Sequence, residues 1–203
     1  MEKRCFERGR SFRSGRSGND NHQDTKKRDT LKTVISASRR TDIPAFYMPW
    51  FMERLRAGWF EVVNPFNNRS RMVPAGPDQV HSIVFWSKNF GPFIDGGYGM
   101  RLREMGYHLF FNFTVNSAVP VLEPAVPPLQ QRLEQLAVLS RHCDPRAINW
   151  RFDPLSFFSR GDGSVHNNLD DFSTIAAHAS DAGIQRCITS FMDHYPKIAR
   201  RIK

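Results

Sequence analysis

The chain turns from polar to β-prone at Thr33-Val34-Ile35-Ser36-Ala37-Ser38, and a helix is predicted directly after this run. Asp42 is suited to cap that helix and Pro44 to begin it, because the first turn has amide hydrogens without helical partners. The apolar residues that follow have helical spacing up to Gly58, which is predicted to end the helix; they are Phe46, Trp50, Phe51 and Leu55. This strand and helix define a unit that the rest of the chain repeats.

Four more strands are predicted at residues 81–86, 108–115, 147–152 and 186–191. Between the first two of these, a Gly-rich stretch leads into a short helix that ends at Met105. Runs 60–63 and 70–73 flank an amide-rich loop, which favours a hairpin before the second core strand. Apolar strands that alternate with helices are typical of a parallel sheet, either a barrel or a doubly wound sheet.

Two further helices are predicted from amphipathic spacing. The first begins after Pro127-Pro128, and its apolar face carries Leu129, Leu133, Leu136 and Ser140. The second is predicted to be capped by Asn167 or Asn168 and to end before Gly183, with a face made of Leu169, Phe172, Ala176 and Ala179. About five strand–helix units result, fewer than an eight-stranded barrel needs, so we expect a partial barrel whose last strand has an open edge.

The basic charge is concentrated at the start of the chain. Residues 1–32 hold ten Lys or Arg and five Asp or Glu, so they contribute +5 of the formal +9. This segment contains an Arg/Gly/Ser-rich run and almost nothing to bury, which predicts a disordered tail with at most weak nucleic-acid binding. Residues 33–203 are then expected to form the barrel domain.

The cysteine and histidine patterns argue against a metal site within this chain. Cys5, Cys143 and Cys187 share no CxxC or CxxxCxxC spacing, and none of the seven histidines forms an HxH or HExxH motif. No apolar run reaches the length of about 20 residues that a membrane span requires, and no signal peptide follows the basic start. We therefore expect a cytoplasmic protein with no membrane partner; the sequence does not indicate an oligomeric state.

Polar side chains stand at the carboxyl end of every predicted core strand, where parallel barrels collect their chemistry. Cations there favour a small anionic ligand, because arginine offers a planar fork and lysine a point charge to carboxylate or phosphate. Aspartates could orient those cations, bind a ribose or accept a proton. The candidate binding residues are Arg39, Arg40, Asp42, Lys88, Asn89, Asn112, Arg151, Asp153, Ser190 and Asp193.

Five stretches of the chain together resemble the domain of unknown function 1848 family. They are Ile35-Ser36-Ala37-Ser38-Arg39-Arg40-Thr41-Asp42-Ile43-Pro44-Ala45-Phe46-Tyr47, Asn64-Pro65-Phe66-Asn67, Phe85-Trp86-Ser87-Lys88-Asn89, Trp150-Arg151-Phe152-Asp153-Pro154 and Ser190-Phe191-Met192-Asp193-His194-Tyr195. The resemblance extends from about Thr33 to Lys203, with the motifs in the order typical of the family.

This resemblance implies a bacterial protein with a radical-SAM-like barrel, of the radical-SAM/TIM type. In full-length relatives it also implies a C-terminal CxxxCxxC, a [4Fe-4S] cluster and S-adenosylmethionine. Such cysteines would fall beyond Lys203, so the chain is expected to be a fragment of a radical-SAM-like enzyme that is inactive alone.

Two other functions stay open at this stage. The basic tail and the strand ends could form a non-catalytic site for nucleic acid or another anion. Alternatively, a metal-free barrel hydrolase or lyase could use Asp153 and Asp193, although no diagnostic motif supports it.

Overall fold

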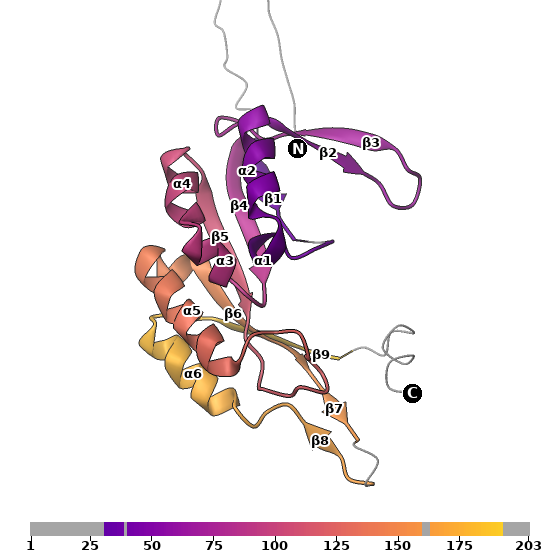
Figure 1. The fold of residues 1–203 in the computed structure, drawn as a ribbon, viewed down its shortest axis with the longest axis vertical. Helices are drawn as coiled ribbons and strands as arrows, with labels where there is room; N and C mark the ends of the chain where they lie inside the picture. The colour runs from indigo at the N-terminus through magenta and orange to yellow at the C-terminus, as the bar shows by residue number, and fades with distance from the viewer. Residues whose placement is uncertain (1–30, 39, 160–162, 193–203) are drawn as a thin grey trace, which may run out of the picture. The chain divides into compact units, whose positions relative to one another are not determined.

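A computed structural model describes residues 31–38, 40–159 and 163–192. Its main sheet has five parallel strands whose order in space follows the chain: β1 (Thr33–Ser36), β4 (Val80–Ser87), β5 (His108–Thr114), β6 (Ile148–Leu155) and β9 (Cys187–Phe191). This order contradicts the doubly wound alternative, in which strands run outward in both directions from a switch point. The sheet curls into a half-barrel (Figure 1).

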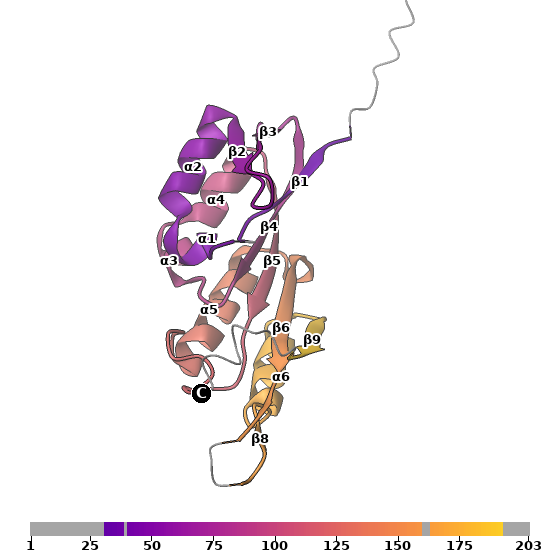
Figure 2. The ribbon, with the colours of Figure 1, turned by 90° about the vertical axis from the view of Figure 1, so that its right-hand side faces the viewer.

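Six α-helices connect or precede the strands: α1 (Ile43–Phe46), α2 (Met48–Ala57), α3 (Gly91–Asp95), α4 (Tyr98–Glu104), α5 (Leu129–His142) and α6 (Phe172–Asp181). A 3-10 turn, η1 (Pro145–Ala147), precedes β6. Helices α1 to α4 lie together beside β1, β4 and β5 (Figure 2). None of the described helices combines the length and apolarity needed to cross a bilayer.

The helix predicted after the first strand is divided in two. The backbone leaves helical geometry at Tyr47, so α1 stops there and α2 starts a new turn. Phe51 and Leu55 are buried as predicted, but Phe46 and Trp50 are exposed. Trp50 precedes Phe51 on α2 and so points to a different side of the helix. Gly58 ends α2 in the left-handed region with φ 80°, which confirms its predicted role.

Aromatic side chains fill the space between the sheet and the helices. Phe85 and Phe111 on adjacent strands meet Phe93 of α3, with ring centroids 5.2 and 5.6 Å away. Phe90 and Phe113 extend this cluster at 4.9 Å. Such edge-to-face pairs add to the burial of apolar area, so this face of the sheet is the core that fixes the strands.

Two small hairpins flank the main sheet. The predicted hairpin is β2 (Trp59–Val63) with β3 (Ser70–Pro74), an antiparallel pair that extends away from the half-barrel (Figure 1). The second, β7 (Phe157–Phe158) with β8 (His166–Asn167), was not predicted, because each strand has only two residues.

The start of α6 differs from the prediction. The helix begins at Phe172 rather than after Asn167 or Asn168. Asn168 is buried, and its side-chain oxygen accepts from Ser156 N at 2.9 Å while its amide donates to Pro154 O at 3.0 Å. Its polar groups therefore anchor the end of β6 instead of capping a helix. Gly183, with φ 75°, follows the helix as predicted.

The strand register separates two faces of the sheet. Trp86 is paired with Asn112, and Asn112 with Asn149. Two residues further along, Thr114 is paired with Arg151. Because side chains alternate along a strand, these residues point away from the face that carries Phe85 and Phe111. The polar side chains thus lie on the face opposite the helices.

Some predictions fall on residues that the structure does not describe. The predicted tail, residues 1–32, lies outside the described residues apart from Leu31 and Lys32. Arg39 and Asp193 also lie outside them. The nucleic-acid hypothesis that depends on the tail stays a prediction.

Candidate functional site

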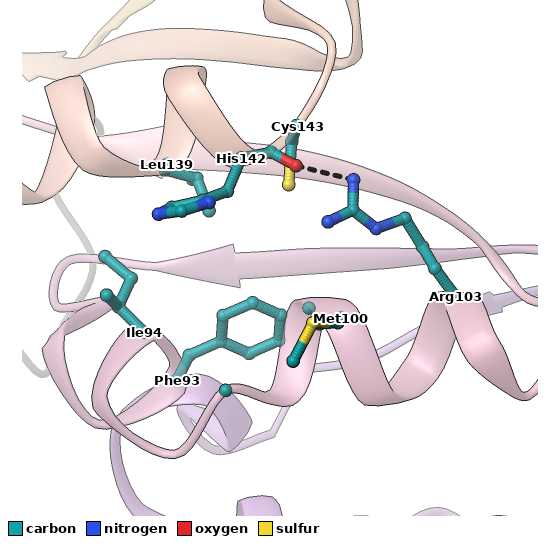
Figure 3. Close-up of a pocket in the computed structure, with 9 residues that line it drawn as sticks. Phe93, Ile94, Met100, Arg103, Leu139, His142 and Cys143 are labelled. Atoms are coloured by element: carbon teal, nitrogen blue, oxygen red, sulfur yellow. Dashed lines mark hydrogen bonds between the residues drawn. The ribbon is translucent and has the colours of Figure 1, made fainter.

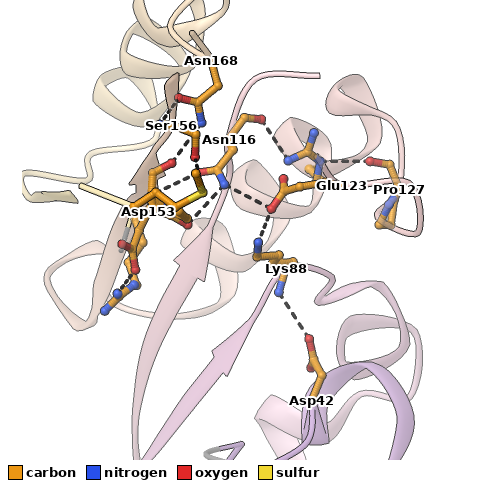
Figure 4. Close-up of polar contacts among 12 residues, drawn as sticks. Asp42, Lys88, Asn116, Glu123, Pro127, Asp153, Ser156 and Asn168 are labelled. Carbon is orange, nitrogen blue, oxygen red and sulfur yellow. Dashed lines mark hydrogen bonds and ion pairs between the residues drawn. The ribbon is translucent and has the colours of Figure 1, made fainter. Parts of the chain in front are cut away.

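Polar side chains at the carboxyl ends of the parallel strands form a continuous chain of contacts, which we call the rim network (Figure 4). It connects segments that are far apart in the sequence, from the residues after β1 to those in β9. Its members are Asp42, Ser87, Lys88, Asn116, Glu123, Arg132, Arg151, Asp153 and Ser190.

Asp42 ties the first helix to the end of β4. One carboxylate oxygen accepts from Ala45 N at 3.0 Å, the capping bond predicted from the sequence. The other accepts from Ser87 Oγ at 2.8 Å and from the Lys88 amide at 3.4 Å. Burial raises the pKa of Asp42 above its ordinary value of 3.8, although these hydrogen bonds oppose the shift.

Lys88 reaches across the network to Glu123 in the loop between β5 and α5. The two side chains form an ion pair in which Glu123 is the more buried partner, with a side chain only 13% exposed. Asn116 Nδ2 also donates to Glu123 Oε1, at 3.2 Å. The other carboxylate oxygen of Glu123 is buried without a hydrogen-bond partner among the described residues.

Asn116 joins the β5–α5 loop to the end of β6. Its side-chain oxygen accepts from Asp153 N at 2.8 Å, and its amide donates to Asp153 O at 3.2 Å. Beneath it, Arg132 donates to Asn116 O at 3.0 Å and to Pro127 O at 2.9 Å. The loop that carries Asn116 and Glu123 is therefore fixed from two sides.

Asp153 is the carboxylate that links β6 to β9. Arg151 forms an ion pair with it, and Ser190 of β9 donates a hydrogen bond to it. Desolvation by burial alone would raise the pKa of Asp153, but the Ser190 and Arg151 hydrogen bonds and the charges of Arg151 and Lys88 together lower it below 3.8. Asp153 is thus an ionised acceptor at neutral pH rather than a carboxyl prepared to donate a proton.

The structure places the predicted site residues that it describes in several different settings. Lys88, Arg151, Asp153 and Ser190 join one network with Asp42, which agrees with the expectation that strand ends converge. Arg40 is exposed. The Asn89 side chain points toward the helices instead. Its Oδ1 accepts from Gly91 N at 3.0 Å and from Gln135 Nε2 of α5 at 2.9 Å.

Asn112 lies within the sheet, not at its end. Its side-chain oxygen accepts from Asn149 Nδ2 at 3.1 Å, and both side chains are buried. Next to them, the guanidinium of Arg151 lies over the Trp86 ring, 4.7 Å from its centroid. This cation–π contact places the Arg151 charge on the face opposite the helices.

Sequence reasoning missed several members of the network. Asn116 stands two residues after Thr114, so a wider window at the strand end would have included it. Glu123 lies in an irregular loop and gives no periodic signal. Arg132 falls within an amphipathic helix, where a charged side chain is expected to face solvent.

A cavity of about 220 Å³ lies elsewhere, between α3, α4 and α5 on the helix side (Figure 3). Phe93, Met100 and Leu139 make its lining mainly apolar, with Cys143 and Arg103 at its edge. Burial raises the pKa of the Cys143 thiol, which disfavours the reactive thiolate. None of the rim network residues lines this cavity.

The thiols of the described residues do not form a cluster site. Cys143 follows α5 and Cys187 begins β9, and both are free. No group of three or more His, Cys, Asp or Glu residues in the described part of the chain is arranged to hold a metal ion. A [4Fe-4S] cluster needs several cysteine ligands together, so these residues do not fit one.

Comparison with known proteins gives one finding. The model of a protein family described as Domain of unknown function (DUF1848) matches residues 34–203, a range that includes the whole rim network. No curated protein and no solved structure matches the chain.

Proposed function

This chain belongs to the DUF1848 family, as its motifs predict, and we propose that its rim network binds an anionic small molecule. The ligand is the substrate or cofactor of an enzyme with a radical-SAM-like or TIM-type barrel. Support for the barrel type comes from the sequential order of the five parallel strands and from the half-barrel curl of the sheet.

Two cations held close together at the rim carry the binding proposal: Lys88 pairs with Glu123, Arg151 pairs with Asp153, and Asn116 bonds to both of these acidic residues. Lys88 follows β4 and Arg151 lies in β6, and β5 separates these strands in the sheet. The charges of both nevertheless act on Asp153 and lower its pKa. Lys88 and Arg151 thus place their positive charges near the same part of the rim, although β4 and β6 are not adjacent in the sheet.

The present contacts of Asp153 indicate the chemistry of the ligand. Its carboxylate is held by an arginine and by a serine hydroxyl. A carboxylate or phosphate group of a ligand offers the same acceptor oxygens and the same charge, so it can compete for these donors. Asp153 and Glu123 thus act as internal counter-ions that keep Lys88 and Arg151 in position.

The radical chemistry implied by the resemblance finds no ligands for its cluster among the described residues, as the positions of Cys143 and Cys187 show. The radical-SAM-like class therefore rests on the family resemblance and the fold, whereas the anion site rests on the contacts of the rim.

Calorimetric titration of the full chain with inorganic phosphate tests the anion site. We expect Arg151→Gln and Lys88→Gln each to weaken binding by about tenfold, since a hydrogen bond to a charged group contributes roughly 1.5–3 kcal/mol. Asp153→Asn should tighten binding, because it removes the internal competitor for Arg151.

Arg146→Gln is the matched control. Arg146 pairs with Asp144 at the same two-residue spacing as Arg151 and Asp153, but in an exposed turn before β6. The Arg146→Gln variant should bind phosphate as tightly as the wild type. Equal losses in Arg146→Gln and Arg151→Gln would mean non-specific charge attraction, and no saturable binding to the wild type would contradict the proposal.

A further inference from the structure

Three polar side chains form a row across the face of the sheet that is opposite the helices. Trp86, Asn112 and Asn149 are paired in register on β4, β5 and β6, and we call them the polar row. Their neighbours on the helix side, such as Phe85 and Phe111, are apolar and buried. Arg151 lies two residues beyond Asn149 on the same strand and face, so the row borders the rim network.

The row contains two polar atoms without partners. Trp86 Nε1 and Asn149 Oδ1 are both buried, and neither has a hydrogen bond among the described residues. Asn149 is only 6% exposed, and its amide already donates to Asn112. A buried polar group without a partner destabilises the folded state, so an apolar row would stabilise the sheet better. The row therefore offers one donor and one acceptor to a partner from outside.

The Arg151 side chain lies over the Trp86 end of the row. The Arg151 guanidinium stacks on Trp86 and is attached to Asp153 at one side. An anionic ligand attracts the guanidinium toward itself, and this movement would uncover the indole.

We propose that the polar row binds the ring of a planar heteroaromatic anion. The ring edge gives an acceptor to Trp86 Nε1 and a donor to Asn149 Oδ1, while the anionic group meets Arg151 and Lys88 at the rim. Strands lie about 4.8 Å apart, so Trp86 and Asn149 start about 10 Å apart, a span that one ring with exocyclic oxygens and its hydrogen bonds can bridge. This inference rests on the proposed anion site and names its ligand class.

Three small probes separate the ring from the charge in calorimetric titrations of the full chain. Orotate carries a lactam edge and a carboxylate, benzoate is a planar carboxylate without polar ring atoms, and uracil has the lactam edge without the charge. We expect orotate to bind about tenfold more tightly than benzoate, since the added hydrogen bonds contribute about 1.4 kcal/mol in total. Uracil should bind more weakly than orotate.

Trp86→Phe tests the donor while it keeps an aromatic ring. The variant should bind orotate no more tightly than benzoate, and its affinity for benzoate should equal that of the wild type. Loss of the donor without a partner should not itself lower the free energy of unfolding, whereas the smaller ring and its weaker contact with Arg151 should lower it modestly. Asn149→Leu, a substitution of similar size, should weaken orotate binding in the same way.

Trp59→Phe is the control, because Arg54 lies over the Trp59 ring at 5.4 Å in a stack away from the polar row. Equal affinities of orotate and benzoate, or an orotate preference that survives Trp86→Phe, would overturn the ring site and leave the anion site standing. Absence of binding by phosphate, benzoate and orotate alike would overturn both.

Discussion

Arg132 shows how a single residue shapes the site without reaching the ligand. It is only 1% exposed, and its guanidinium donates to the carbonyl groups of Asn116 and Pro127 at the two ends of the β5–α5 loop. Desolvation by burial lowers the pKa of Arg132, while the charges of Glu123 and Asp171 oppose the shift. The residue thus holds in place the loop that carries Asn116 and Glu123.

Arg132→Met should lower the free energy of unfolding by about 3 kcal/mol, because it removes two charge-assisted hydrogen bonds and leaves buried carbonyl groups without donors. It should also weaken phosphate binding, since Glu123 and Lys88 lose their fixed positions. Urea unfolding followed by circular dichroism measures the first effect and calorimetry the second. Arg141→Met, on the exposed side of the same helix, is the control, and an equal loss there would refute the role of Arg132.

At the scale of elements, the segment formed by α1 and α2 has a distinct termination at each end. Asp42 caps α1, and Gly58 ends α2 with a backbone bond from Gly58 N to Leu55 O at 3.0 Å. Gly58 O then accepts from Ala75 N at 2.8 Å, which connects the helix end to the hairpin. The left-handed residue therefore sets the direction in which β2 leaves the helix.

Gly58→Ala should cost about 1–2 kcal/mol of unfolding free energy, from backbone strain at φ 80°. An added Cβ would meet no atom within 4 Å, so steric contact contributes nothing. Gly58→Asn should cost clearly less, because asparagine tolerates the left-handed region. Urea titration of the two variants checks this ranking, and equal losses would show that the conformation of Gly58 does not limit stability.

The same scale shows what periodicity can and cannot predict. The five core strands and α5 follow from apolar spacing, and the convergence of Lys88, Arg151 and Asp153 follows from the rule that parallel strand ends share an edge. The late start of α6 does not follow from apolar spacing. It depends on the hydrogen bond from Ser156 to Asn168, which is a contact between elements. Glu123 was likewise missed, since its position is set by the path of a loop.

At the scale of the whole described sheet, the two edges are β1 and β9. All five residues of β9 are exposed, including Phe191, which is 74% exposed. Among the described residues no strand pairs with the outer edge of β9. An exposed strand edge with apolar side chains is a template for pairing with another copy of the chain.

We expect the full chain to self-associate as its concentration rises and Phe191→Lys to weaken association by about tenfold, because a buried phenyl group contributes roughly 1.5–3 kcal/mol and a lysine repels its copy. Sedimentation velocity over a range of concentrations measures this, with a reductant present because Cys187 is exposed and free. Val165→Lys is the control, since Val165 is also 74% exposed but lies outside the main sheet. A wild-type chain that stays monomeric at every concentration would show that the β9 edge does not drive pairing.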